Sequence, residues 1–253
     1  MCYSIYMQES SVTILQQIID KSKRIVFFGG AGVSTESGIP DFRSVDGLYN
    51  LKWKYPPEQI ISHSFFMRDP KEFYRFYREK LLVNGIEPNP AHYKLAELEQ
   101  KGKLLAIVTQ NIDGLHQKAG SKTVYELHGS TLRNYCMDCG EFYDDNFIRQ
   151  TADSPDTLPH CKTCGGLVKP DVVLYEEGLN QEIIENAVNA IRNADTLIIG
   201  GTSLTVYPAA GLINYFRGEK LVLLNKSSTP QDAMASLVIH EPIGQVLSQI
   251  KVE

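Results

Sequence analysis

Residues 24–43 read RIVFFGGAGVSTESGIPDFR. Its first five residues form a short apolar, β-rich run that breaks into Gly29, Gly30 and Gly32. A buried parallel strand that leads into a glycine turn is the conformation such a pattern favours. Glycines allow the backbone to approach a ligand closely, and free N–H groups at the start of a helix attract phosphate. A simple tight turn is the alternative interpretation of the same residues.

Three further apolar runs have the length and composition of the first. Helical patterns separate them along the chain. Strands that alternate with helices and end in Gly, Ser, Thr or Asn predict an α/β fold with a parallel, doubly wound, Rossmann-like sheet. Ligands of such sheets bind beyond the carboxyl ends of the strands, so we expect the four strand ends to face one crevice. The expected strands are residues 24–28, 104–108, 196–199 and 221–224, and the expected helices are residues 12–21, 91–100, 182–192 and 209–216.

Two segments interrupt this alternation. Residues 45–90 are rich in aromatic side chains and have helical patterns, which indicates a helical insertion. Residues 133–168 hold four cysteines and few apolar runs, so we do not expect them to fold around a core of their own. The expected organisation is a Rossmann-like main domain and a small domain that both insertions form. The main domain is assigned residues 1–44, 91–132 and 169–253, and the small domain residues 45–90 and 133–168.

Composition and charge narrow the class of protein. The chain has 253 residues, of which 43% are hydrophobic and 22% charged, as in ordinary globular proteins. A net charge of −5 gives no reason to expect direct binding of nucleic acid, which needs clustered positive charge. The apolar runs are too short to span a membrane, and the first ten residues, MCYSIYMQES, lack the pattern of a signal peptide. We therefore expect a cytoplasmic protein, and we assign no role to Cys2.

Four cysteines follow the pattern Cys136-x2-Cys139-x21-Cys161-x2-Cys164. Each Cys-x-x-Cys pair makes a tight thiolate turn, and two such pairs supply the four sulfur ligands that tetrahedral zinc prefers. Four protein ligands leave no position for water, which predicts a structural zinc rather than a catalytic one. Four unrelated buried thiols are the alternative. We expect His160, beside Cys161, to face solvent.

The glycine loop departs from the usual dinucleotide fingerprint. Gly30 and Gly32 match it, but Thr35 stands where the third glycine belongs. No acidic residue closes the second expected strand, which runs into Thr109, Gln110 and Asn111. These departures disfavour an ordinary NAD-dependent dehydrogenase.

Several long strings of the chain resemble the sirtuin family of NAD-dependent protein deacylases. They are GAGVSTESGIPDFRS (30–44), TQNIDGLHQKAG (109–120), LHG (127–129), the two cysteine pairs and GTSLTVYPAA (201–210), in the order of the family. The resemblance covers the chain from about residue 10 to its end. It implies that the acyl group of an acylated protein lysine passes to ADP-ribose while nicotinamide leaves. It also implies NAD+ and one structural Zn²⁺ as cofactors.

The resemblance implies a role for each polar residue on the nicotinamide side. His128 corresponds to the general base, and an ordinary imidazole can accept a proton at neutral pH. Asn111 would orient the ribose and a water, Asp113 with Ile112 would hold the carboxamide, and Gln110 would bond a ribose hydroxyl. A polar strand end with a satisfied turn is the alternative for these residues. We regard His63, His92, His116 and His240 as structural or exposed.

Further cofactor contacts are carried over in the same way. Phe42 would cover the reacting face of the ribose, and the guanidinium of Arg43 would donate to cofactor oxygens. Without the family, Phe42 would be assigned to the core and Arg43 to a surface ion pair. The adenosine side of the expected site consists of Ala31, Thr35, Thr202, Ser203, Asn225 and Ile243, the last of which is otherwise a core residue.

Substrate peptides of sirtuins bind as an added strand between the two domains. The corresponding stretch here is residues 168–178, VKPDVVLYEEG. Val172 and Val173 would contact the lysine stem, and Tyr175 would contact the peptide. Sirtuins often have an aromatic residue and a glycine where this chain has Tyr175 and Glu176, a departure that affects peptide preference.

The resemblance favours acetyl as the acyl group. Pro40 and Asp41 match deacetylase-type members. Members that act on acidic acyl groups pair a tyrosine with an arginine three residues later, and this chain has Tyr77 and Lys80 at that spacing. Preference for other acyl groups, such as succinyl, is therefore an alternative. Placement of Tyr77 and Lys80 on a helix surface is the structural alternative.

Two other functions remain open at this point. Protein mono-ADP-ribosyl transfer would use the same cofactor with an amino-acid acceptor. A catalytically silent zinc module that binds a protein or nucleic acid belongs to a different class altogether.

Overall fold

The computed structural model describes residues 10–252. Cys2 and the first nine residues of the expected NAD-binding domain lie outside the described residues. The main sheet has six strands in the order β3-β2-β1-β7-β8-β9, and every neighbouring pair is parallel. Four of them confirm the expected strands, and the two others have only three residues each. The strands are β1 (Ile25–Gly29), β2 (Leu104–Thr109), β3 (Val124–Glu126), β7 (Thr196–Gly200), β8 (Lys220–Leu224) and β9 (Leu237–Ile239).

This strand order is the one that doubly wound dinucleotide-binding sheets have. Counted along the chain, the six strands are arranged 3-2-1-4-5-6. The order reverses between β1 and β7, where Gly29 is in register with Gly200 on one side and with Thr109 on the other. Ligands bind outside the carboxyl ends of the strands at such a point. The glycine-rich ends of β1 and β7 therefore lie where a dinucleotide is expected.

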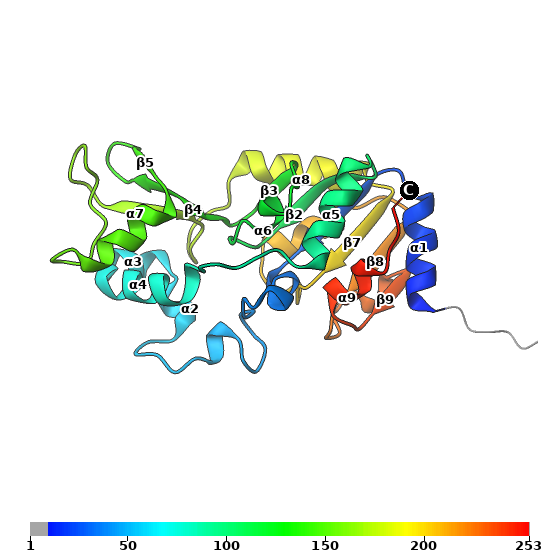
Figure 1. Cartoon of the computed structure of the whole chain (residues 1–253), viewed down its shortest axis with the longest axis horizontal. Helices are drawn as coiled ribbons and strands as arrows, with labels where there is room; N and C mark the ends of the chain where they lie inside the picture. Colours follow the sequence, from blue (N-terminus) through cyan, green and yellow to red (C-terminus); the bar gives the residue numbers. More distant parts are fainter. Residues whose placement is uncertain (1–9, 253) are drawn as a thin grey trace, which may run out of the picture.

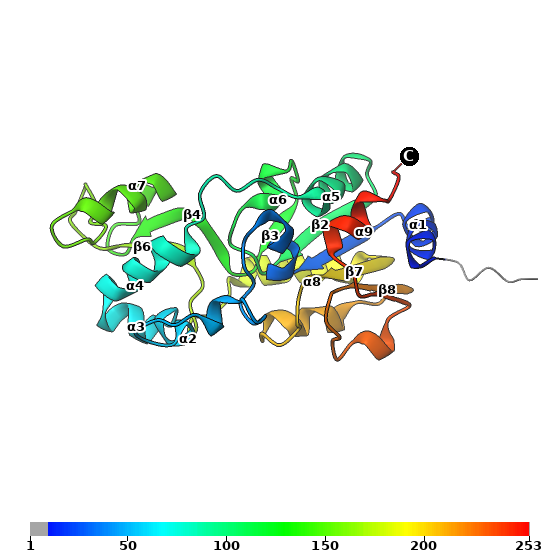
Figure 2. The ribbon, with the colours of Figure 1, turned by 60° about the horizontal axis from the view of Figure 1, so that its bottom comes forward.

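Helices cover both faces of the main sheet (Figures 1 and 2). Leu15, Leu95 and Val246 come from three helices and join one apolar cluster on one face, while Ala187 and Leu212 join the cluster on the other face. The first face carries α1 (Ser11–Lys21), α5 (Pro90–Gln100) and α9 (Ile243–Ser248), and the second carries α8 (Gln181–Asn193) and η6 (Ala209–Tyr215). The helix expected at 209–216 is a 3₁₀ helix, and Gly211 near its centre disfavours α-helix. Short elements in the loops are η1 (Ala31–Val33), η2 (Thr35–Ser37), α6 (Leu115–Lys118) and η7 (Asp232–Met234).

A smaller unit lies at the far end of the elongated molecule (Figure 1). It contains an antiparallel sheet in the order β5-β4-β6, and β6 pairs with β4 from Val172 at Gly129 to Val168 at Cys136. Helices from the aromatic insertion pack beside this sheet. Its elements are η3 (Leu48–Asn50), α2 (Pro57–Ile60), α3 (His63–Arg68), α4 (Pro70–Phe76), η4 (Tyr77–Leu81), β4 (Gly129–Cys136), β5 (Phe142–Tyr143), α7 (Asp145–Gln150), η5 (Thr151–Asp153) and β6 (Val168–Val172).

The aromatic insertion and the cysteine-bearing segment share one core. Phe66, Phe73 and Tyr74 are fully buried and meet edge to face, and the same cluster includes Cys136 and Ile148 from the other segment. Aromatic rings in this arrangement bury large apolar areas. The segment of residues 133–168 thus packs on the insertion rather than around a core of its own, as expected. Within residues 10–252, no helix has both the length and the apolarity needed to cross a bilayer.

Candidate functional site

A cleft of about 830 Å³ lies between the carboxyl edge of the main sheet and the small unit. Loops that follow β1, β2, β7 and β8 contribute to its walls, so the four expected strand ends do meet in one crevice. The small unit contributes residues after β6 and from the aromatic insertion. The cleft is lined by every residue expected to contact cofactor or peptide: Ala31, Thr35, Phe42, Arg43, Gln110, Asn111, Ile112, Asp113, His128, Val172, Val173, Tyr175, Thr202, Ser203, Asn225 and Ile243.

The loops after β1 and β7 are packed backbone against backbone. Gly32 N donates to the Gly201 carbonyl at 2.8 Å, and a Cβ at Gly32 would lie 2.7 Å from Gly201 Cα. A Cβ at Gly30 would lie 2.8 Å from Thr202 Cβ. Only glycine fits at such approaches. The two glycine loops therefore form one wall of backbone without side chains, which suits the phosphates of a dinucleotide.

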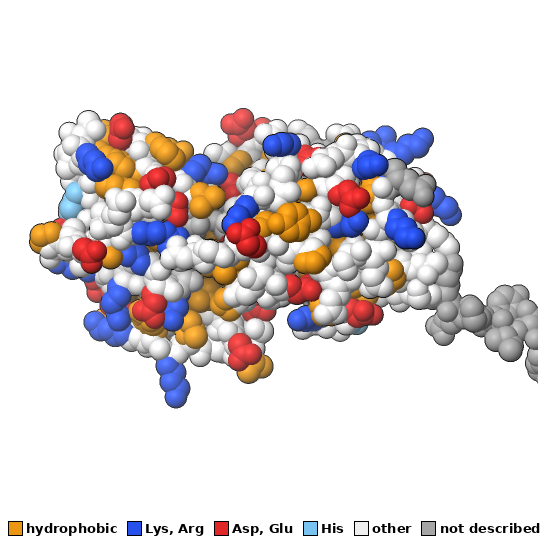
Figure 3. All heavy atoms as spheres, viewed as in Figure 1, with side chains coloured by type: hydrophobic (Ala, Val, Ile, Leu, Met, Phe, Trp, Pro, Cys, Tyr) orange, Lys and Arg blue, Asp and Glu red, His pale blue; other side chains and the backbone are white. Residues whose placement is uncertain are grey.

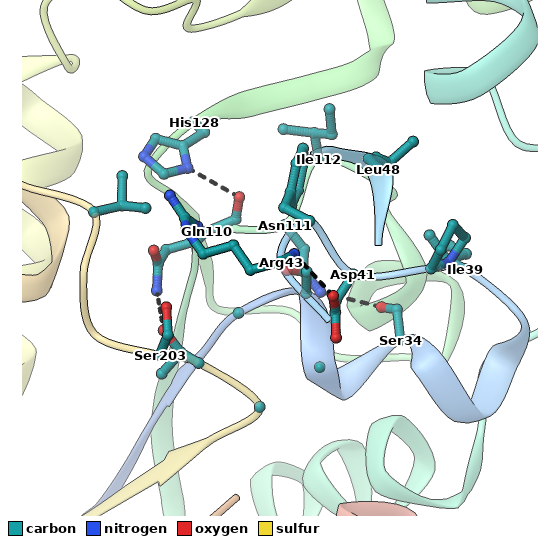
Figure 4. A pocket seen from close by; sticks show the side chains of 18 of the residues that line it. Ser34, Ile39, Asp41, Arg43, Leu48, Gln110, Asn111, Ile112, His128 and Ser203 are labelled. Atoms are coloured by element: carbon teal, nitrogen blue, oxygen red, sulfur yellow. Dashed lines mark hydrogen bonds between the residues drawn. The ribbon is translucent and has the colours of Figure 1, made fainter. Parts of the chain in front are cut away.

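His128 lies in the connection between β3 and β4 and is held by one hydrogen bond. Its Nδ1 lies 3.1 Å from the Gln110 carbonyl oxygen (Figure 4). A carbonyl can only accept, so Nδ1 carries the proton and Nε2 has the free lone pair. Burial lowers the pKa of His128 from its usual 6.5, and the bond to Gln110 opposes this only in part. The imidazole is therefore neutral at pH 7 and able to accept a proton at Nε2.

A buried chain of hydrogen bonds joins the polar residues after β2 to the glycine loop. Asn111 Nδ2 donates to Ser34 Oγ at 3.1 Å, and Ser34 Oγ donates to Asp113 Oδ2 at 2.7 Å. The other oxygen of Asp113 accepts from Leu115 N at 2.9 Å. Burial raises the pKa of Asp113 although these donors lower it. Ser34 was not predicted, because its partners lie far away along the chain.

The other cofactor-side residues are also held in place. Gln110 Nε2 donates to Thr202 Oγ1 at 3.0 Å, which links the ends of β2 and β7. Asn225 Nδ2 donates to the Ser227 carbonyl at 2.7 Å after β8. Ile243 is 3% exposed and belongs to the core cluster, yet it also lines the cleft. Both interpretations of Ile243 are thus compatible with its position.

Phe42 and Arg43 lie on a loop whose conformation is held by hydrogen bonds to the Asp41 side chain. Asp41 Oδ1 accepts from Arg43 N at 3.0 Å and from Ser44 N at 2.7 Å. The Arg43 guanidinium lies 5.2 Å from the centre of the Tyr49 ring, and the Phe42 ring lies 5.3 Å from the same ring. Figure 4 shows the Arg43 side chain in the same hollow as Gln110. Tyr49 was not predicted and supports both side chains.

The segment expected to bind the peptide, residues 172–175, is hydrogen-bonded to the main sheet's connection at His128 and to the small unit at Ile61. Val173 N donates to the His128 carbonyl at 3.0 Å, and Tyr175 N donates to the Ile61 carbonyl at 3.0 Å. The hydroxyl oxygens of Tyr175 and Tyr49 lie 2.7 Å apart. The segment therefore connects His128, Ile61 of the small unit and Tyr49, which packs beside Phe42 and Arg43.

The four cysteines form a compact cluster of free thiols. Their sulfur atoms all lie within 4.8 Å of one another, which fits one tetrahedral structural zinc. Gly140 and Gly165 follow the two turns at φ of 75° and 79°, and each donates its N–H to the first cysteine of its pair at 3.0 Å. The exposed His160 lies 2.8 Å from Asp156 and does not join the cluster, as expected. The four cysteines that could hold the metal are the expected ones, Cys136, Cys139, Cys161 and Cys164.

Of Tyr77 and Lys80, only Lys80 lines the cleft. Tyr77 is fully buried in the core of the small unit and is not among the cleft residues, so its placement on a helix surface was wrong. Tyr77 is an apolar neighbour of Phe73, whose ring it stacks on at 5.6 Å. Lys80 does line the cleft, with its amine 2.9 Å from Glu79. A tyrosine–cation pair for an acidic acyl group is therefore not assembled at the cleft.

Comparisons with known proteins agree on one family. The model described as the Sir2 family matches residues 30–208. A protein of Clostridium perfringens (strain 13 / Type A) named NAD-dependent protein deacetylase is 61% identical over 245 residues, which cover 96% of this chain and 99% of the relative. A solved structure described as Sir2-p53 peptide-NAD+ has a TM-score of 0.84 and 38% identity, and the match covers 93% of this chain and 95% of that one. A second, described as Sir2 bound to acetylated peptide, has a TM-score of 0.84 and 37% identity over 93% and 95% of the two chains.

Proposed function

The chain belongs to the Sir2 family, and from this premise we propose that it is an NAD-dependent protein-lysine deacetylase. It transfers the acetyl group of a modified lysine to ADP-ribose and releases nicotinamide. The observation that carries the proposal is a neutral, oriented imidazole at residue 128 on the cleft that the four strand ends form.

The cleft has the donors that a dinucleotide needs. The glycine wall formed by Gly30 and Gly32 admits the diphosphate, and the guanidinium of Arg43 adds a fixed positive charge. Thr202, Ser203 and Asn225 would bind the adenosine side. NAD+, when bound, supplies a ribose carbon that becomes electrophilic as nicotinamide leaves.

His128 would act as the general base. The Gln110 carbonyl holds the proton on Nδ1, so that Nε2 accepts the proton of a ribose hydroxyl. Burial keeps this nitrogen unprotonated at neutral pH. The same arrangement would return the proton at the end of the turnover.

Asn111 and Asp113 would orient the nicotinamide side. Ser34 ties both side chains together, which leaves few alternative rotamers for either. Asn111 would position the ribose and a water, and Asp113 with Ile112 would hold the carboxamide. Fixed donors and acceptors of this kind reduce the reorganisation needed at the moment of reaction.

The acyl-lysine peptide would enter as an added strand beside residues 172–175. Main-chain hydrogen bonds give such binding its affinity, which allows broad sequence tolerance. Val172 and Val173 would contact the lysine stem, and Tyr175 would contact the peptide. Because Tyr77 is buried away from the cleft, acetyl is favoured over succinyl.

The zinc would hold the small unit in shape without taking part in the reaction. Free thiols in a metal cluster suit a reducing compartment, which supports action in the cytoplasm. Acidic and basic side chains are interspersed on the face that Figure 3 shows, and the net charge is −5, so no direct nucleic-acid partner is proposed.

The proposal is tested with the whole purified chain, NAD+ and an acetyl-lysine peptide. We expect nicotinamide release that requires the peptide, and O-acetyl-ADP-ribose as the product in mass spectrometry. A succinyl-lysine peptide measured in parallel should react more slowly. Attachment of ADP-ribose to protein without loss of acetyl would instead support ADP-ribosyl transfer, and no peptide-dependent cleavage of NAD+ would refute both enzymatic functions.

A further inference from the structure

Residues 174–177 form a tight turn at the edge of the cleft. Glu177 N donates to the Leu174 carbonyl at 3.1 Å, which closes the turn, and Glu176 occupies its third position with φ of 76°. A turn with a left-handed third residue strongly favours glycine there, because a Cβ meets the following carbonyl oxygen. Glutamate at this position is therefore unfavourable unless its side chain compensates.

The Glu176 side chain bonds to the start of α3. Its Oε2 accepts from Ser64 N at 2.9 Å, and its Oε1 accepts from Ser64 Oγ at 3.0 Å. Both carboxylate oxygens are thus bound to a single residue 112 positions earlier. Hydrogen bonds to a charged acceptor are stronger than neutral ones. This pair of bonds stabilises the left-handed residue.

The turn is fixed to the small unit on the same side. His63 N donates to the Tyr175 carbonyl at 3.0 Å, next to the Ser64 contact. Glu177 has its own partners, since it accepts from His63 Nδ1 at 2.9 Å and from Leu174 N at 2.9 Å. Glu176 is bonded to Ser64 alone among these neighbours. The orientation of Tyr175 at the cleft is therefore set by both ends of the turn.

We propose that Glu176 is a positioning residue that holds the peptide-binding edge, residues 172–175, in place through its two bonds to Ser64. The inference rests on the proposed function, because that edge is where the acyl-lysine peptide would pair. Glu176 itself lines the cleft, and it controls peptide affinity by shaping this edge rather than through its charge. Neither the proton transfer at His128 nor the binding of NAD+ depends on it.

We call the two hydrogen bonds from Ser64 to Glu176 the tether. Three substitutions at residue 176 distinguish the effect of the tether on peptide affinity from the effects of the left-handed backbone and of the negative charge. Glu176→Gln keeps an oxygen for Ser64 N and an amide that can donate to Ser64 Oγ, so its KM for the acetyl peptide stays within about twofold of wild type. Glu176→Gly loses the tether but fits the left-handed backbone, and its peptide KM rises about threefold. Glu176→Ala loses the tether and also lacks the freedom of glycine in a left-handed backbone, so its peptide KM rises about tenfold. In all three variants, kcat and the KM for NAD+ stay within about twofold of the wild-type values.

Ser64→Ala tests the other end of the tether. Ser64→Ala removes the bond from Ser64 Oγ and keeps the bond from Ser64 N, so we expect a rise of about twofold in peptide KM. Combined with Glu176→Ala it should give no further rise, because that substitution already removes both bonds. Thr157→Gly is the matched control, since Thr157 also has a left-handed backbone at φ of 62° but does not line the cleft. Its peptide KM should equal that of wild type.

The outcomes distinguish this inference from the proposed function. Equal peptide KM values for the Gln, Gly and Ala variants, or additive effects of Ser64→Ala and Glu176→Ala, would overturn the tether. A wild-type chain without deacetylase activity would instead defeat the proposed function. In that case hydrogen exchange still measures the tether, because the Glu177 amide should exchange faster in Glu176→Ala than in wild type. Unchanged exchange would overturn it.

Discussion

His92 and His116 form a buried imidazole pair that should make the fold sensitive to acid. Their ring centres lie 4.8 Å apart between α5 and α6, and both residues are at most 1% exposed. His92 Nδ1 accepts from Asn89 N at 3.2 Å, but His92 Nε2 and both nitrogens of His116 have no partner among the described residues. Burial lowers the pKa of His92 to about 4 and that of His116 well below 6.5.

The direction of the effect follows from these pKa values. The unfolded chain binds a proton at each histidine below pH 6.5, whereas the native fold keeps His92 neutral until about pH 4. The contribution of neutral His92 to the free energy of unfolding is therefore fully present above pH 6.5. It is lost as the pH falls from 6.5 to about 4. Between about pH 7.5 and about pH 5, His92 alone should remove about 2 kcal/mol. His116 adds to this loss in the same direction.

The variant His92→Gln isolates the contribution of His92 to this loss of stability at low pH. Asn89 caps α5, and glutamine at the position of His92 can accept its N–H as the histidine does. Urea unfolding followed by circular dichroism, with zinc present throughout, gives the free energy of unfolding at both pH values. The wild-type loss should exceed the loss of His92→Gln by about 2 kcal/mol. Equal losses for the two proteins would refute the account of a neutral buried pair.

Three further predictions concern the active site and the metal. His128→Ala should lower kcat by about a hundredfold or more while calorimetry still detects NAD+ binding, and normal turnover would remove the imidazole from the mechanism. Because burial lowers the pKa of His128, the acid limb of kcat/KM should have its midpoint below pH 6.5, and a midpoint above that value would contradict the assigned environment. Cys136→Ser should lose zinc in metal analysis and melt at a lower temperature. A variant as stable as wild type with its zinc retained would show that this thiol is not a structural ligand.

The four long strands were predictable because each contains a continuous apolar run that ends at glycine, threonine or asparagine. β1 and β7 are examples, and their boundaries differ from the expected ones by one residue. β3 and β9 were missed, since three residues carry too little periodicity. Their strand conformation comes from pairing with β2 and β8, which supply the hydrogen bonds.

The candidate site was predictable as a set of positions but not as a network. Residues expected from motifs do line one cleft, since parallel strands bring their carboxyl ends to the same edge. Ser34 was missed although it joins Asn111 and Asp113, which lie 77 and 79 positions away. The contact of Glu176 with Ser64 was missed for the same reason. No local pattern reports which hydroxyl will face which carboxylate.

The strand ends that build the cleft, the four thiols of the zinc site and the family could all be identified from the sequence. These depend on residue types at fixed spacing, which are visible before folding. The proton on Nδ1 of His128, the neutral state of His92 and the left-handed conformation of Glu176 could be identified only in the folded chain. Each of these depends on desolvation or on a partner distant in the chain. Solvation and long-range contacts exist only once the chain is folded.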